Sequence, residues 1–213
     1  MLTVISPAKK LDYSGTQTAQ PFTQPALIEH AKELHKGLKN LSPQDVCALM
    51  GLSDKLGALN YERFQEWHTP FNAENAKQAV LAFKGDVYQG LDADSMTQAD
   101  LEWAQNNLCI LSGLYGVLRP LDLMQPYRLE MGTKFVNPRG KDLYHFWDGI
   151  INQHLNSLLT GSNPVLVNLA SNEYFKATRE KTLSCRIVTP IFMDNKDGTY
   201  KTISFFAKKA RGL

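Results

Sequence analysis

Three short apolar runs, far apart in the chain, most constrain how it folds. They are Leu2–Ser6, Leu108–Leu111 and Val165–Leu169, and long segments with helical patterning separate them. Short apolar runs bounded by turn residues are typical of buried strands, and strands that alternate with helices favour parallel pairing. We therefore expect these three segments to be neighbouring strands of one sheet.

A hairpin is predicted near the end of the chain. Asn195-Lys-Asp-Gly198 contains the Asp-Gly pair that suits a tight turn, and the segments Cys185–Met193 and Thr199–Phe206 flank it. Parallel and antiparallel strands together predict an α+β fold, a mixed β-sheet flanked by helices. The helices expected around the sheet span residues 26–39, 43–50, 54–67, 73–84, 99–107 and 142–159, and another begins near residue 207.

The chain is expected to form a single domain over residues 1–213, because it is short and has no long linker. No apolar run approaches the roughly 20 residues of a membrane span. The apolar stretch at the N-terminus has no basic segment before it, so it does not resemble a signal peptide. We expect a cytoplasmic protein with no membrane partner.

The cysteine and histidine patterns predict no metal site and no cofactor. The 3 cysteines form no CxxC pair, and the 5 histidines show neither HxxxH nor HExxH spacing. The phosphate-binding patterns GxxxxGK[ST] and GxGxxG do not occur either.

Each predicted strand ends in a loop rich in polar side chains. Ligands of open α/β sheets bind beyond the carboxyl ends of the strands, so we expect these loops to converge on a crevice. An excess of cations there predicts a small anionic ligand, with phosphate the commonest. The alternative is that the arginines pair with Asp122 and Glu130 in an ordinary loop network. The cations in question are Lys9, Lys10, Arg119 and Arg128.

The same crevice offers groups for acid/base chemistry. Glu173 is the candidate general base, and Tyr115 and Glu130 are the other candidate catalytic residues. A carboxylate near a tyrosine and several cations suits an enzyme that acts on a nucleotide or a damaged base. Catalysis in the crevice therefore stays an alternative to a purely binding function.

A second candidate site is a helix pair joined by Gly51-Leu-Ser53. This layout resembles a helix-hairpin-helix, which points backbone N–H groups and a helix N-terminus at a nucleic-acid phosphate. Lys55 and Arg63 would add positive charge. Such a device contacts the DNA backbone, so binding would be independent of base sequence. The usual second glycine is Ser53 here, and the alternative is a helical hairpin that only packs.

The charge distribution points weakly to an anionic partner. Residues 1–106 hold 9 basic and 13 acidic side chains, whereas residues 107–213 hold 14 basic and 8 acidic ones. A basic half favours a partner such as nucleic acid. The two halves could equally complement each other across one core.

Four segments together resemble the YaaA family of bacterial peroxide stress proteins. They are Ile5-Ser-Pro-Ala-Lys-Lys-Leu-Asp12, Leu111-Ser-Gly-Leu-Tyr-Gly-Val-Leu-Arg-Pro-Leu-Asp122, Pro126-Tyr-Arg-Leu-Glu-Met-Gly132 and Asn168-Leu-Ala-Ser-Asn-Glu-Tyr174.

The resemblance implies a cytosolic protein of the hydrogen peroxide response that limits free iron and DNA damage. It also implies a mixed α/β fold that binds duplex or branched DNA through a helix-hairpin-helix and a basic cleft. Family members extend some tens of residues further, so we expect this chain to be C-terminally truncated relative to them.

Overall fold

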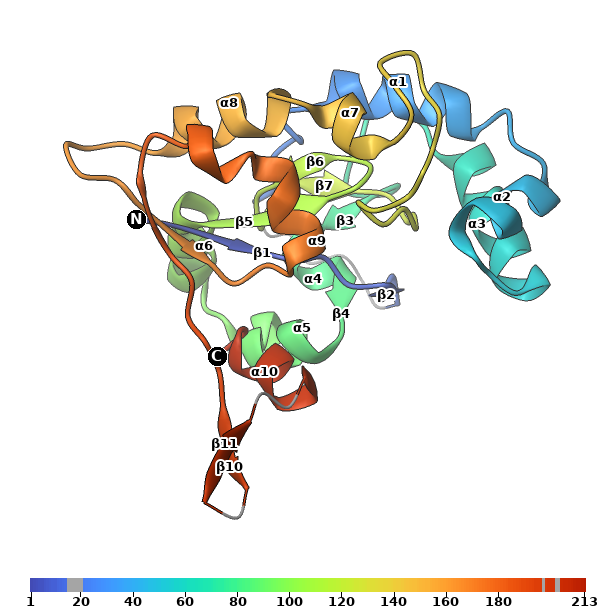
Figure 1. The fold of residues 1–213 in the computed structure, drawn as a ribbon. Coiled ribbons are helices and arrows are strands. Elements are labelled where there is room, and N and C mark those ends of the chain that lie inside the picture. The colour runs from blue at the N-terminus through green and yellow to red at the C-terminus, as the bar shows by residue number, and fades with distance from the viewer. Residues whose placement is uncertain (15–20, 197, 202–203) are drawn as a thin grey trace.

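The predicted strands and helices assemble around one mixed sheet. The computed structural model describes residues 1–14, 21–196, 198–201 and 204–213 (Figure 1). The sheet has 5 strands in the order β6-β5-β1-β8-β9. They are β1 (Leu2–Ile5), β5 (Leu108–Ser112), β6 (Gly116–Leu118), β8 (Val165–Asn168) and β9 (Arg186–Val188).

The three apolar runs are adjacent parallel strands, as predicted. Val4 in the central strand β1 pairs with Cys109 of β5 on one side and with Asn168 of β8 on the other. The short strand β6 runs antiparallel to β5 and pairs Leu118 with Ile110. Parallel and antiparallel pairs in one sheet confirm the α+β class.

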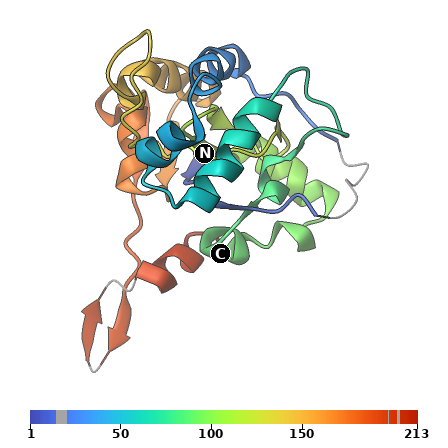
Figure 2. The same cartoon turned by 90° about the vertical axis from the view of Figure 1, so that its right-hand side faces the viewer.

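Helices cover the sheet on two sides. Figures 1 and 2 place α1, α7 and α8 on one side and α4 and α5 on the other, and α2 and α3 form a pair at one end. The helices are α1 (Ile28–Leu38), α2 (Pro43–Met50), α3 (Asp54–Glu66), α4 (Ala79–Ala82), α5 (Asp86–Leu91), α6 (Gln98–Asn107), α7 (Leu143–Trp147), α8 (Ile150–Leu158), α9 (Asn172–Phe175) and α10 (Ser204–Ala210). Three 3₁₀ turns span Ala93–Ser95, Lys176–Thr178 and Glu180–Thr182.

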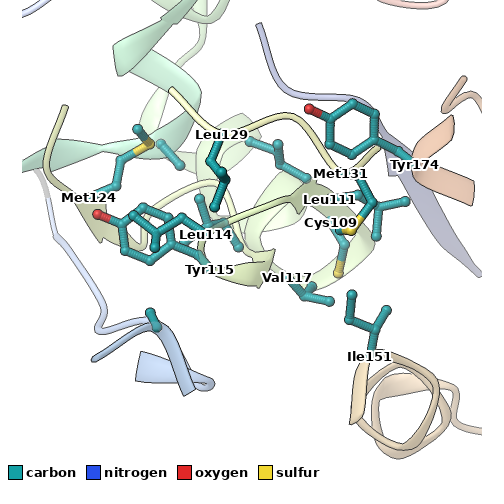
Figure 3. Packing of buried hydrophobic residues seen from close by; sticks show 14 of the residues in the cluster. Cys109, Leu111, Leu114, Tyr115, Val117, Met124, Leu129, Met131, Ile151 and Tyr174 are labelled. Atoms are coloured by element: carbon teal, nitrogen blue, oxygen red, sulfur yellow. The ribbon is translucent and has the colours of Figure 1, made fainter. Parts of the chain in front are cut away.

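The main core extends from β1 and α1 across β5 and β6 to the segments that follow them. Figure 3 shows Leu111 and Val117 from the sheet packed with Leu129, Met131 and Ile151. All five side chains are buried, with at most 2% of their surface exposed. Burial on this scale stabilises the fold by roughly 25 cal/mol for each Å² of apolar surface removed from water.

The predicted helix over residues 73–84 is wrong except for one turn. Its apolar positions Ala76, Ala79, Val80 and Phe83 are all buried, as the pattern indicated. The backbone, however, pairs with distant segments on either side of α4, and such tertiary pairing overrides local helix propensity. Strand β3 (Lys77–Gln78) pairs with β7 (Leu123–Met124), and β4 (Phe83–Lys84) pairs with β2 (Lys10–Leu11).

The predicted helix over residues 142–159 is broken into α7 and α8. Asp148, which follows α7, adopts a positive φ of 35°, and the next residue, Gly149, is the N-cap of α8. The Arg179 side chain pairs with the Asp148 carboxylate. The apolar residues of both pieces still face the core, so the periodicity was informative about burial and not about the break.

The C-terminal hairpin forms, but with different strands from those predicted. Arg186–Val188 joins the main sheet in parallel with β8, where Ile187 and Val188 are half-buried. The hairpin consists of β10 (Asp194–Lys196) and β11 (Thr199–Lys201) and projects from the body in Figures 1 and 2. Helix α10 begins at Ser204, within the segment predicted as a strand, and residues 202–203 lie outside the described residues.

Candidate functional site

A small crevice lies beyond the carboxyl ends of the parallel strands. Strands β1, β5 and β8 run the same way, so the segments that leave them emerge at the same edge of the sheet. The crevice has a volume of about 80 Å³. Its lining comes from three segments: Pro7–Lys9 after β1, Tyr127–Glu130, and Glu173–Tyr174 in α9.

The cations of the crevice are partly neutralised by Glu130. Arg128 donates from Nε to Oε1 of Glu130 at 3.0 Å, and its Nη2 lies 3.0 Å from the same oxygen. The Lys9 ammonium lies 3.3 Å from that oxygen as well. The Arg128 and Glu130 side chains are only 18% and 19% exposed, so solvent screens this pair less than a surface pair. The pairing of Arg128 with Glu130 is the alternative that the sequence left open.

Glu173 is held at the rim of the crevice. The Gly132 backbone N–H donates to its Oε1 at 2.8 Å, and the Tyr144 hydroxyl donates to its backbone carbonyl at 2.9 Å. The residue is exposed. The carboxylate is therefore oriented by the protein while remaining accessible from solvent.

Two tyrosines form the apolar part of the wall. Tyr127 and Tyr174 are 5% and 8% exposed, and burial raises the pKa of both phenols well above the usual value. The Tyr127 hydroxyl lies 2.6 Å from Ser112 Oγ. Both side chains are therefore neutral at physiological pH and present aromatic surface rather than charge.

Tyr115 is a core residue and does not line the crevice. Its hydroxyl accepts hydrogen bonds from Trp67 Nε1 at 2.8 Å and from the Gln125 backbone N–H at 3.1 Å. The side chain is fully buried, which raises its pKa. These contacts give Tyr115 a packing role. They place it apart from the crevice residues with which acid/base chemistry was expected.

Arg119 and Lys10 are also outside the crevice lining. The Gly-rich turn after β5 reverses the chain into antiparallel β6, so Arg119 emerges beside the middle of β5 rather than at its carboxyl end. Lys10 is exposed on β2, where it lies opposite Lys84. The crevice thus brings together Lys9, Arg128, Glu130 and Glu173. The sequence did not point to Gly132, which orients Glu173, because it contributes only its backbone N–H.

The second candidate site, the α2–α3 hairpin, is a tight helix pair. Gly51 ends α2 with a left-handed φ of 60°, a conformation that glycine adopts without strain. A Cβ added to Gly57 in α3 would lie 2.0 Å from the Cys47 sulfur in α2, so only glycine permits this packing. The two predicted helices and their short turn are confirmed by this geometry.

The first turn of α3 is exposed and lacks a side-chain cap. Helix α2 begins with a full capping box, in which Ser42 and Asp45 bond each other's backbone N–H groups. Ser53 occupies the corresponding position of α3, yet its side chain makes no cap hydrogen bond. Gly51, Ser53 and Lys55 are all exposed.

Arg63 is the second basic residue expected in the hairpin. It lies two turns along α3 from Lys55, and its Nη1 donates to Asn60 Oδ1 at 3.2 Å. Burial, followed by the nearby Arg128 charge, lowers the pKa of Arg63, with the Tyr13 phenol opposing them. Arg63 lines a separate pocket with Trp67 and Gln125 and is not part of the crevice lining.

Across the described part of the chain, no group of three or more His, Cys, Asp or Glu side chains comes together in a way that would hold a metal ion. No helix in the described ranges is both long and apolar enough to cross a membrane.

Comparison with known proteins gives a consistent result over the full length. A family model described as "Peroxide stress protein YaaA" matches residues 1–213. A relative named "UPF0246 protein" from Saccharophagus degradans is 62% identical over 215 residues, which cover 100% of this chain and 84% of that protein. Proteins of the same name from Teredinibacter turnerae and Shewanella loihica are 59% and 56% identical, over 100% of this chain and 83% of each relative. The chain belongs to the peroxide stress protein YaaA family.

Proposed function

We propose that this protein binds DNA independently of sequence during the response to hydrogen peroxide. The oxidative stress role is that of the family. In this proposal the protein acts in the cytoplasm, grips duplex or branched DNA by its phosphates, and limits free iron and DNA damage. The iron and damage parts rest on the family resemblance alone, whereas the phosphate grip has a structural argument.

The observation that carries the proposal is the exposed, uncapped N-terminus of α3. Helices leave their first backbone N–H groups without partners inside the helix, and those groups attract anions together with the positive end of the helix dipole. A side-chain cap would satisfy part of that capacity, as Ser42 does in α2. At Ser53 no such bond forms, so hydroxyl and amide donors remain available for a phosphate.

The surroundings of the hairpin both favour and oppose an anion. Lys55 in the first turn of α3 adds positive charge, and Arg63 follows about 12 Å further along the helix axis. Asp54 in the same turn repels phosphate. Because Asp54 offsets part of the attraction, the hairpin is suited to weak contacts with several phosphates along a DNA backbone rather than to tight binding of one phosphate.

Charge reversal at Lys55 tests the hairpin. We expect Lys55→Glu to weaken binding of unrelated duplex sequences to the same extent, because the contact is with backbone phosphate. Lys181→Glu, at an exposed lysine outside the hairpin, is the matched control and should bind nearly as well as the parent. Fluorescence anisotropy with labelled duplexes measures both. Equal affinity of Lys55→Glu and Lys181→Glu would refute the hairpin grip.

The crevice supports a second candidate function, an enzyme that acts on a nucleotide or base. The observation in its favour is that Glu173 lines a pocket with its carboxylate oriented and accessible. Glu130, the other carboxylate, is engaged by two cations and is less available for proton transfer. Turnover of a nucleotide by the parent but not by Glu173→Gln is the test, and equal turnover by both would remove Glu173 as the base.

A further inference from the structure

We propose that the crevice beyond β1 and β8 binds a single nucleotide, with its phosphate on Lys9 and Arg128 and its base beside Glu173. The nucleotide is either free or part of a DNA strand, and the recognising groups are the same for both. This inference goes beyond DNA binding by the hairpin. It supplies a ligand for the second candidate function without requiring catalysis.

The position of the crevice is the first argument. The next strand of this sheet after β1 is β5, which pairs on one side of β1, whereas the later strand β8 pairs on its other side. Connections that leave a sheet in opposite directions open a gap beyond the strand ends, where open α/β sheets bind their ligands. Pro7–Lys9 from β1 and Glu173 from α9 line this gap.

Lys9 and Arg128 keep donors for a phosphate. Arg128 uses Nε and Nη2 on Glu130, and no contact of Nη1 is found among the described residues. The Lys9 side chain is 69% exposed, and its ammonium, which has three N–H donors, lies 3.3 Å from a single carboxylate oxygen, Oε1 of Glu130. Arg63 adds positive charge near Arg128. A phosphate can therefore bind here while Glu130 keeps both cations in place.

The carboxylates argue against a bare anion and for a ligand that also donates hydrogen bonds. Glu130 and Glu173 would repel inorganic phosphate that made no other contact. The Gly132 N–H engages one oxygen of Glu173, and the other has no partner among the described residues. That oxygen suits the exocyclic amino group of a base.

The tyrosines close the apolar wall of the crevice. The hydroxyls of Tyr127 and Tyr174 are already engaged, by Ser112 Oγ and by the Met131 backbone respectively. Both residues are buried, at 5% and 8% exposed, so a ligand that enters meets a narrow apolar edge rather than an open stacking face. The crevice volume of about 80 Å³ is smaller than a whole nucleotide, so only part of the proposed ligand enters it, and the exposed Lys9 and Glu173 contact the part that stays outside.

Calorimetric titration of the protein with nucleoside 5′-monophosphates tests the proposal, with the matching nucleosides and inorganic phosphate titrated separately. Lys9→Gln and Glu173→Gln should each weaken nucleotide binding about tenfold, a loss of one charge-assisted contact. Lys10→Gln and Glu180→Gln change equally exposed residues outside the crevice, and should bind as the parent does. Glu173→Gln should weaken the binding of nucleotides whose base carries an amino group more than the binding of thymine or uracil nucleotides.

A parallel titration with gapped duplex DNA, which holds one unpaired nucleotide, distinguishes the two sources. If only the gapped DNA binds, and Lys9→Gln and Glu173→Gln weaken it relative to an intact duplex, the nucleotide belongs to DNA. Lys55→Glu should weaken both DNAs and leave free nucleotide binding unchanged, so failure of the hairpin grip remains distinguishable. The proposal is overturned if no ligand depends on Lys9 and Glu173, or if inorganic phosphate binds as tightly as every nucleotide.

Discussion

The Gly57 backbone lies against the Cys47 side chain, so closely that a Cβ at position 57 would sit 2.0 Å from the sulfur. This contact sets the distance between α2 and α3. It therefore positions the exposed turn Gly51–Ser53 on which the proposed phosphate grip depends.

Gly57→Ala should destabilise the protein and loosen the hairpin. Overpacking of a tight contact costs about 1–3 kcal/mol. Removal of the sulfur should relieve much of the clash, so the double variant Cys47→Ala, Gly57→Ala is expected to regain stability. Denaturant unfolding of the three proteins checks this order. A single variant as stable as the parent would contradict the close packing.

Ser42 and Ser53 should behave differently when each is changed to alanine. Ser42 caps α2 through the Asp45 N–H, so Ser42→Ala should lower the free energy of unfolding by about 1 kcal/mol. Ser53 makes no such bond, and Ser53→Ala should leave stability nearly unchanged while weakening DNA binding. Unfolding and anisotropy measurements on both variants test the pair. Equal stability losses would mean that Ser53 is an ordinary cap.

Tyr115→Phe should act on stability rather than on the crevice. The substitution removes the acceptor for Trp67 Nε1–H and the Gln125 N–H, both buried. Leaving buried donors unsatisfied costs about 1–3 kcal/mol each. We expect a clearly lower melting temperature with nucleotide affinity unchanged. Loss of nucleotide binding at full stability would restore Tyr115 to the functional site.

Asp122 should make the protein less stable as pH rises from about 4 to 6. Burial raises the pKa of this carboxyl from 3.8 to about 6, although hydrogen bonds from the Arg119 backbone and the Thr23 hydroxyl oppose the shift. The folded state therefore holds the proton more tightly than the unfolded chain. Its stabilising contribution is complete below pH 3.8 and is lost as pH rises through 6.

The size of this effect is about 3 kcal/mol at most, since each pKa unit corresponds to about 1.4 kcal/mol. Asp122→Asn does not titrate, so the difference in unfolding free energy between parent and variant should change across this range and stay flat above it. Denaturant unfolding at closely spaced pH values measures that difference. A difference that is constant with pH would show that the carboxyl is not perturbed.

The sequence was most informative where burial alone decides the structure. Every residue of the strand around Cys109 is buried, and no residue of the strands around Val4 and Leu166 is exposed, so their apolar composition predicted their state and their parallel neighbours. The helix pair α2–α3 was also predictable, because Pro43 and Gly51 mark its limits locally.

The remaining elements depend on contacts between distant residues. Lys77–Gln78 forms a strand because Leu123–Met124 pairs with it, and nothing within residues 73–84 signals that partner. The break at Asp148 accompanies an ion pair with Arg179, 31 residues further along the chain. Apolar periodicity reports which residues are buried and is silent on both of these contacts.

The candidate site also contains residues that the sequence located and residues whose positions depend on distant contacts. Lys9, Arg128, Glu130 and Glu173 were predictable because they follow parallel strands or lie in the adjoining loop. Arg119 was misplaced, since its position depends on the direction in which the chain leaves the turn at Gly116. The sequence left open whether Glu130 pairs with the cations beside it, and only the structure shows that Arg128 and Lys9 both contact its Oε1.

Binding of duplex and four-way-junction DNA across a salt series tests the central claim most directly. Fluorescence anisotropy should give an affinity that falls linearly on a log–log plot, with a slope of about −0.9 for each duplex phosphate contacted. Asp54→Asn should bind more tightly than the parent at every salt concentration, because it removes the acidic group beside the α3 N-terminus. Anisotropy that stays flat at low salt, for parent and variant alike, would contradict the claim that this chain binds DNA.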